Sequence, residues 1–157
     1  MLGYSVGFMS PTPDINAPEN PSYKQVCSKT TSHVEVLHIR FNNKVTTYEE
    51  LVKFLFTFHD PTTFNRQKQD KGPQYASTIF YHSEEQRKIA EEVKEKVQDL
   101  IIEKKIPQAK FESFKVATKI APASTYYPAH DEHQEYLFKK PNGYCNHRYR
   151  FHWGDVE

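Results

Sequence analysis

One acidic residue interrupts an apolar alternation near the first quarter of the chain. In residues 33–41, Glu35 shares its side of the alternation with Leu37, Ile39 and Phe41. A period of two with β-branched residues predicts a strand. We expect this face to meet the core, where desolvation would raise the pKa of Glu35 and suit it to act as a general acid near neutral pH. The alternative is a glutamate at the strand end that points past the core edge into water.

A long polar segment runs from His59 to Ser77 without an apolar period. It gathers Asp, Asn, Arg, Gln and Tyr side chains, the groups that bind a small polar ligand. Links of this length inside a domain are more often functional than not, which makes the segment a candidate binding loop. A solvated surface loop is the alternative.

The two cysteines differ in their surroundings. Cys27 follows Val26 ahead of a predicted strand, and we expect a buried, inert thiol there. Cys145 ends the turn-rich run 141–145, and an exposed thiol on a mobile arm is suited to thiol–disulfide exchange. Two cysteines cannot form a disulfide framework, so we expect a reducing compartment and a cytoplasmic location.

Other charged and histidine-rich features give weaker indications. His130 and His133 stand at i and i+3 on a predicted helix, but a metal site needs three or four converging ligands, and we expect none. The basic and aromatic run 147–153 is short and is followed by Asp155 and Glu157. With a formal net charge of +1 and no apolar run of about 20 residues, we expect neither nucleic acid nor a membrane as partner.

The elements that must position these residues interleave strands and helices. Thr47 and Glu50 form a capping box for a helix that ends near Phe58, and a second helix begins at Ser83. We also expect strands over 75–81 and 111–120, a proline-rich loop over 10–22, a short helix over 126–137 and an irregular tail over 138–157. One domain over residues 1–157, of α+β class or an α/β sandwich, accounts for the 157 residues.

Several blocks, in their order along the chain, resemble the A-type peptide methionine sulfoxide reductases (MsrA). The segment 59–77 is the most specific of them, with departures from the family at Lys68, Pro73 and Ala76. The matching blocks are Gly3-Tyr4, residues 20–27, His33-Val34-Glu35-Val36, His59-Asp60-Pro61-Thr62, residues 65–77, residues 133–137 and Gly143-Tyr144-Cys145.

The resemblance implies a fold and a reaction. The fold would be a ferredoxin-like α/β sandwich, and the reaction would reduce methionine S-sulfoxide, free or in oxidised proteins, by thiol chemistry without a cofactor. By motif, Glu35 is the acid, Tyr23 and Tyr75 bind the sulfoxide oxygen, Asp70 orders the pocket, and Cys145 is the resolving cysteine that thioredoxin recycles. Cys27 matches a position with no catalytic part.

The resemblance also implies a missing part. The family carries its nucleophile in a Gly-Cys-Phe-Trp-Gly block ahead of the segment that matches Gly3-Tyr4, and the sequence contains no such block. We expect the first strand and helix of the sandwich to be missing, which would leave unpaired strand edges and a tendency to aggregate. Either the chain is a truncated reductase or it is a non-catalytic module that binds methionine sulfoxide.

Overall fold

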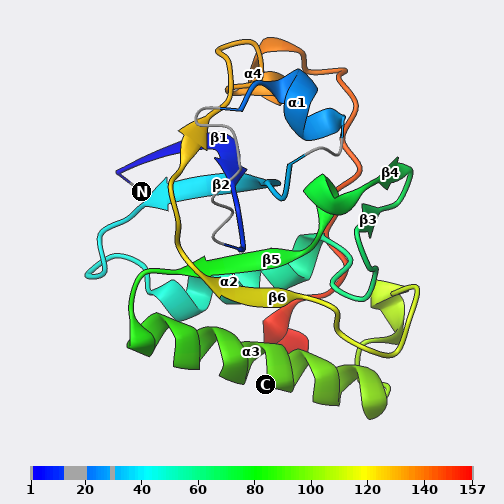
Figure 1. Cartoon of the computed structure of the whole chain (residues 1–157). Helices are drawn as coiled ribbons and strands as arrows, with labels where there is room; N and C mark the ends of the chain where they lie inside the picture. Colours follow the sequence, from blue (N-terminus) through cyan, green and yellow to red (C-terminus); the bar gives the residue numbers. More distant parts are fainter. Residues whose placement is uncertain (1, 13–20, 29–30, 157) are drawn as a thin grey trace.

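The strands in the described part of the chain form two larger sheets and one short hairpin (Figure 1). The computed structural model describes residues 2–12, 21–28 and 31–156, without the side chains of Tyr23 and Cys27. Most of the predicted loop over 10–22 and the side chains of those two residues therefore lie outside the described part. Among the described residues, no helix is long and apolar enough to cross a membrane.

The first sheet has three antiparallel strands in the order β2-β1-β7. Strand β1 (Gly3–Met9) pairs along its whole length with β2 (Val34–Arg40), from Gly3 opposite Arg40 to Met9 opposite Val34. On its other side β1 pairs with the two-residue strand β7 (Tyr127–Pro128). The predicted strand over 33–41 is confirmed as β2, whereas β1 was not anticipated from the sequence.

The side chain of Gln134 continues the hydrogen bonding on the side of β1 that faces β7. Gln134 accepts a hydrogen bond from Val6 N at 2.8 Å and donates one to Val6 O at 2.8 Å, as a neighbouring strand would. Gly7 allows the close approach on this side, because a Cβ there would lie 2.3 Å from the carbonyl oxygen of Tyr127. Gln134, which belongs to the 133–137 block, therefore has a structural role beside β1.

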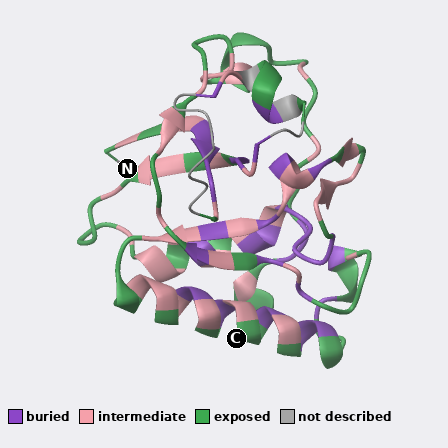
Figure 2. Cartoon of the chain, viewed as in Figure 1, coloured by how far each residue is buried: buried purple, intermediate pink, exposed green. Residues whose placement is uncertain are grey.

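The second sheet pairs β5 (Thr78–Tyr81) in parallel with β6 (Lys119–Pro122), and α3 (Glu84–Ile102) lies between them in sequence. Helices α2 (Tyr48–Phe58) and α3 pack on this sheet, and the apolar side chains between these elements form the core. Figure 2 shows buried stretches of the ribbon on these elements. Phe56 is fully buried at its centre. Other members of this cluster are Val52, Ile79, Ala90, Val93, Val97, Leu100, Ile101, Ile106, Ala109, Val116 and Phe151.

Both predicted long helices begin where the sequence places them. Thr47 caps α2 with the reciprocal Glu50 contact, and the hydroxyl of Ser83 accepts from Gln86 N at the start of α3. Helix α2 buries Val52 and Phe56, whereas Phe54 is 49% exposed. The helix carries aromatic and aliphatic residues on more than one of its sides, so the sequence period does not decide which side is covered.

The prediction for the covered face of β2 is wrong. Val34 is buried, whereas Glu35 is exposed and Leu37 is 53% exposed. Alternation along a strand tells which residues share a face, but not which face receives a packing layer. On β2 the side that carries Glu35 and Leu37 is therefore the more exposed of the two.

Two other predicted elements are also wrong in extent. The strand over 111–120 is reduced to β6, and residues 111–118 follow an irregular path. The helix over 126–137 is replaced by β7 and the single turn α4 (Tyr136–Lys139), because Gln134 and its neighbours serve β1 instead. His130 and His133 therefore do not lie on a common helix.

Short elements occupy the two polar ends of the molecule. The segment 59–77 contains the hairpin β3 (Arg66–Gln67) and β4 (Asp70–Lys71), followed by the 3₁₀ turn η1 (Pro73–Tyr75). The remaining short helices are α1 (Tyr23–Cys27), η2 (Pro107–Ala109) and η3 (Trp153–Asp155). The final segment runs from α4 past the β3–β4 hairpin to the side of α3 (Figure 1).

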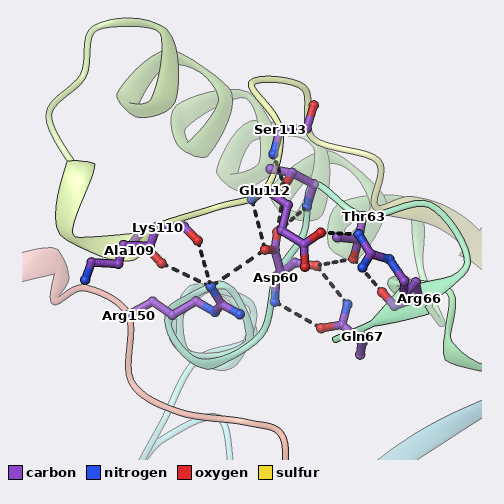
Figure 3. A network of polar contacts seen from close by, with 10 residues as sticks. Asp60, Thr63, Arg66, Gln67, Ala109, Lys110, Glu112, Ser113 and Arg150 are labelled. Carbon is purple, nitrogen blue, oxygen red and sulfur yellow. Dashed lines mark hydrogen bonds and ion pairs between the residues drawn. The ribbon is translucent and has the colours of Figure 1, made fainter. Parts of the chain in front are cut away.

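A buried ion pair joins this final segment to the end of α2 (Figure 3). Arg150 Nη1 lies 3.7 Å from Asp60 Oδ2, and both side chains are almost completely buried. Thr62 donates to Asp60 Oδ1 from its backbone N at 2.9 Å and its hydroxyl at 2.6 Å, and Glu112 N donates to Oδ2 at 3.2 Å. Arg150 also donates to the carbonyl of Ala109 at 3.0 Å. Burial lowers the pKa of Arg150, but Asp60 and the carbonyl acceptors favour its charged form.

Strands β2 and β5 each end a sheet, so each has an edge without a strand partner among the described residues. Unpaired N–H and C=O groups on such an edge are a template for association with another chain. The exposed Leu37 on β2 adds apolar surface at the same place.

We expect the chain to self-associate through the β2 edge and Leu37→Lys to weaken this association, because a charge on an edge strand opposes pairing with another copy. Sedimentation velocity across a concentration series measures the effect. Val45→Lys is the matched control, since Val45 is 75% exposed in a turn outside the sheets. Equal effects of the two lysines would contradict a role for the edge.

We expect Arg150→Met to lower the free energy of unfolding by about 3–5 kcal/mol, because Asp60 would remain buried without its cation. Urea unfolding followed by circular dichroism measures the loss. Arg148→Met removes an exposed arginine two residues away, and we expect it to change stability by no more than about 0.5 kcal/mol. Similar stabilities for the two variants would show that the ion pair does not hold the segment in place.

Candidate active site

Glu35 has the strongest electrostatic perturbation among the residues predicted to act. Burial of its carboxyl, together with the negative charge of Asp70, raises its pKa from 4.5 to about 7. The residue as a whole is exposed on β2, so protein crowds the carboxyl without sealing it from solvent. Both causes act in the same direction, since each disfavours the carboxylate. A carboxyl with this pKa is partly protonated at neutral pH and still open to a ligand, as a general acid must be.

Asp70 stands on β4, and the C-terminal segment contacts it. Asn146 Nδ2 donates to Asp70 Oδ2 at 2.5 Å and to Gln67 O at 3.2 Å. The hydroxyl of Tyr144 donates to the same Asp70 oxygen at 3.3 Å. Asp70 therefore links the neighbourhood of Glu35 to the segment that carries Cys145.

Tyr75 ends η1, which packs against β2, the strand of Glu35. Gly72 opens this turn with a φ of +151°, a conformation that side chains rarely adopt, and a Cβ there would lie 2.2 Å from the amide oxygen of Gln74. Gln74 is itself buried. The glycine and the buried glutamine thus fix the turn that presents Tyr75.

Cys145 is a free, exposed thiol. Its sulfur lies 3.9 Å from His147 Nδ1, a weak contact at most. The His147 ring packs on Phe58 with 5.3 Å between ring centroids, and burial lowers its pKa. The prediction of an exposed thiol in a turn-rich tail agrees with this placement.

Tyr23 begins α1, where Ser22 forms a capping box with Gln25. The side chain of Tyr23 lies outside the described part, so its predicted role stays a prediction. The structure brings Glu35, Asp70 and the Cys145 segment into one neighbourhood and places the turn of Tyr75 beside β2.

A hollow of about 360 Å³ opens on the same face of the sheet as Glu35. Phe8 lines it and is the direct cross-strand partner of Glu35, so the two side chains share a face. The volume is at the lower end of small-molecule sites. Its other lining residues are Pro21, Ser22, Pro128, Ala129 and His130. Glu35 itself is not among them. His130 also borders a larger, open depression together with Asp131 and Glu132, and Glu35 does not line that one either.

His59 is a structural residue of the 59–77 segment. Its Nδ1 lies 2.6 Å from Leu55 O and its Nε2 lies 2.8 Å from Ser77 Oγ, which in turn contacts Thr118 Oγ1 at 2.8 Å. Burial lowers the pKa of His59 to about 4, so the ring is neutral at pH 7. The carbonyl of Leu55 requires a proton on Nδ1, which leaves Nε2 to accept from Ser77. With both side chains buried, this pair is closed to a substrate.

The predicted absence of a metal site remains an expectation. Across residues 2–12, 21–28 and 31–156, no group of three or more His, Cys, Asp or Glu side chains could hold an ion.

Comparison with known proteins decides the family. The sequence model described as "Peptide methionine sulfoxide reductase" matches residues 6–155 of this chain. The chain belongs to this family. MsrA 1 of Rhodopirellula baltica is 45% identical over 128 residues, which cover 81% of this chain and 61% of that protein. MsrA of Saccharolobus solfataricus is 45% identical over 127 residues, which cover 80% of this chain and 66% of that protein.

The fold agrees with solved structures of the family. Mxr1 from Saccharomyces cerevisiae in its reduced form superposes with a TM-score of 0.79 at 38% identity, over 94% of this chain and 77% of that one. The predicted α+β class of the MsrA type is thereby confirmed. The chain spans less than two thirds of the length of the two MsrA relatives.

Sequence reasoning missed two contacts that organise the site. Tyr144 belongs to the quoted Gly-Tyr-Cys block, but nothing in that block indicates a bond to Asp70. Asn146 had no signal at all, because its partner lies 76 residues earlier in the chain. Contacts of such separation become visible only when the final segment is placed against the hairpin.

We expect the pKa of Glu35 to be about 7 and to fall in Asp70→Asn, because the nearby negative charge is removed. NMR titration of the side-chain carboxyl measures both values. Asp99→Asn, an exposed substitution on α3, is the control and should leave the pKa of Glu35 in place. An unchanged pKa of Glu35 in Asp70→Asn would show that the two carboxyls do not interact.

The same shift predicts a pH dependence of stability. A folded-state pKa above the ordinary value means that the folded protein binds the proton more tightly. The contribution is complete below about pH 4.5 and is lost as the pH rises to about 7. Relative to Glu35→Gln, the chain should therefore become less stable across this interval in urea unfolding.

Proposed function

We propose that this chain supplies the acid and the resolving thiol for reduction of methionine S-sulfoxide to methionine. The observation that carries the proposal is the carboxyl of Glu35, whose pKa of about 7 keeps it partly protonated at neutral pH. An ordinary glutamic acid would be protonated to less than about 1% at pH 7. Sulfoxide oxygen is a poor leaving group until it is protonated, so this is the group that the reaction requires.

The proposed reaction proceeds in two thiol steps. A cysteine thiolate attacks the sulfoxide sulfur while Glu35 gives a proton to the oxygen, so that a bond forms between the two sulfurs and the S–O bond breaks with release of hydroxide. The hydroxide then attacks the cysteine sulfur, which displaces methionine with the electron pair of the S–S bond and leaves the cysteine as a sulfenic acid. Cys145 then attacks the sulfenic sulfur, which forms a disulfide and releases water. A dithiol of thioredoxin reduces this disulfide, so the two electrons that reduce the sulfoxide come from thioredoxin.

Tyr75 and Tyr23 would hydrogen-bond the sulfoxide oxygen, and Asp70 would order the pocket and keep Glu35 protonated through its charge. The substrate would be methionine sulfoxide, free or in oxidised proteins, as in repair after oxidative stress. With two cysteines in the sequence, a reducing compartment such as the cytoplasm suits this chemistry. No cofactor is needed, because thiols supply the electrons.

The attacking thiolate is the part that this sequence does not provide in the family's form. Neither Cys27 nor Cys145 stands in a Gly-Cys-Phe-Trp-Gly block. We therefore assign the attack to the cysteine of such a segment, placed ahead of Gly3, which would act together with Glu35 and Cys145. By itself the 157-residue chain should show no turnover of methionine S-sulfoxide with excess dithiothreitol.

We expect the chain with a Gly-Cys-Phe-Trp-Gly strand and helix of the family joined ahead of Leu2 to reduce methionine S-sulfoxide. Glu35→Gln should then slow turnover by about 10²–10⁴-fold, because the general acid is lost. Cys145→Ser should abolish turnover driven by thioredoxin and leave turnover driven by dithiothreitol, which bypasses the resolving thiol. A chromogenic methionine S-sulfoxide substrate measures both rates.

Glu132→Gln is the matched control, since Glu132 is exposed and is not among the charges that shift the pKa of Glu35. Full activity of Glu35→Gln in the joined chain would contradict the assignment of the acid. Turnover by the 157-residue chain alone, abolished by Cys27→Ser or Cys145→Ser, would contradict the assignment of the nucleophile to the added segment. Saturable binding of a methionine-sulfoxide peptide without turnover in the joined chain would favour a non-catalytic module.

A further inference from the structure

The segment that carries Cys145 is attached to the body of the protein at residues 148–150, at Asn146 and, by a longer bond, at Tyr144. On its C-terminal side, Arg148 N donates to Phe58 O at 3.1 Å and Arg150 N donates to Thr57 O at 2.7 Å. The buried contact of Arg150 with Asp60 secures the same side. These bonds hold residues 148–150 on the end of α2, and none of them involves Asn146 or Cys145.

The second place is the side chain of Asn146, next to the cysteine itself. Its carboxamide donates to Asp70 Oδ2 at 2.5 Å and to Gln67 O at 3.2 Å. Gln67 and Asp70 are opposite each other in the β3–β4 hairpin, so one amide group spans both strands. The hairpin is held in turn by Gln67, whose side chain accepts from Asp60 N at 3.1 Å and donates to Asp60 O at 2.8 Å.

The chemistry of this contact suits a carboxamide and excludes a carboxylate. A carboxylate oxygen and a backbone carbonyl only accept hydrogen bonds, whereas the amide nitrogen of asparagine has two N–H donors. Both donors are used here. Aspartate has the same shape but no donor, and it would place a second negative charge against Asp70.

We propose that Asn146 is a positioning residue, which holds the Cys145 thiol beside the neighbourhood of Asp70 and Glu35 by bridging the two strands of the β3–β4 hairpin. The inference rests on the proposed function for the use of the thiol, but the contact itself does not depend on substrate. Tyr144 assists from the other side of Cys145 through its hydroxyl on Asp70 at 3.3 Å. Tyr144 is 61% exposed, and the longer bond makes it the weaker of the two contacts.

The advantage for the reaction is geometric. A thiol that must capture a sulfenic acid acts faster when it is kept close to it, because less conformational freedom is lost at the reacting moment. Without Asn146, the first position after Cys145 whose backbone is bonded to α2 would be Arg148, three residues further along the chain. The thiol would then move on a short flexible tether.

The test measures backbone order along the segment in the 157-residue chain, by ¹⁵N NMR relaxation. We expect order parameters near ~0.85 for residues 144–146 and a fall below ~0.6 in Asn146→Ala. Asn142→Ala, an exposed asparagine of the same segment, is the matched control and should leave these values unchanged. The urea midpoint of Asn146→Ala should stay close to that of the parent, because the Arg150 anchor remains.

An exchange of the two partners distinguishes a specific bond from general packing. Asn146→Asp should loosen the segment at least as much as Asn146→Ala, since two carboxylates would face each other. Adding Asp70→Asn should restore part of the order, because the amide and the carboxylate then have exchanged places. Unchanged order in Asn146→Ala, or no recovery in the double variant, would overturn the proposal. Neither result depends on sulfoxide reduction, so the proposed function can fail or stand separately.

Discussion

The buried contact between Asp60 and Arg150 is the interaction on which the arrangement of the site depends. It joins the end of α2, the 59–77 segment and the final segment at one point (Figure 3). Two charges in a dry environment carry a desolvation cost, so they persist only because hydrogen bonds offset part of it at both groups, although Arg150 Nε has no hydrogen-bond partner among the described residues. Backbone N–H groups and the Thr62 hydroxyl do this for Asp60, and carbonyl oxygens at 109 and 110 do it for Arg150. The pair is better understood as a device that fixes geometry than as a source of net stability.

From this point the site is built outward along polar contacts. Gln67 ties the hairpin to the backbone of Asp60, the hairpin presents Asp70, and Asp70 meets the Cys145 segment through Asn146 and Tyr144. The charge of Asp70 then acts on Glu35 across to β2. Glu35 thus stands on a strand and Cys145 in the final segment, and Asp70 connects the two. A change at Asp60 would be felt at Cys145 through this chain of contacts.

The two larger sheets differ in how densely apolar residues pack against them. Most of the apolar core lies between α2, α3 and the β5–β6 sheet, whereas the β1–β2 sheet carries the acid at a less densely packed place. Leu37 on the same strand is 53% exposed. The same openness leaves the carboxyl of Glu35 accessible. Its pKa is raised by crowding and by a neighbouring charge, not by complete enclosure.

The sequence by itself determined the local features of this protein. Capping residues predicted where α2 and α3 begin, alternation predicted β2, and ordered motifs indicated the family, because each of these signals depends on neighbours within a few residues. Only the tertiary structure decided that Val34 rather than Glu35 faces the core, that Gln134 serves β1 in place of a helix, and that Asn146 reaches Asp70. The physical reason is that burial and long-range hydrogen bonds depend on which surfaces meet, and a period along one strand or helix contains no information about what lies against it.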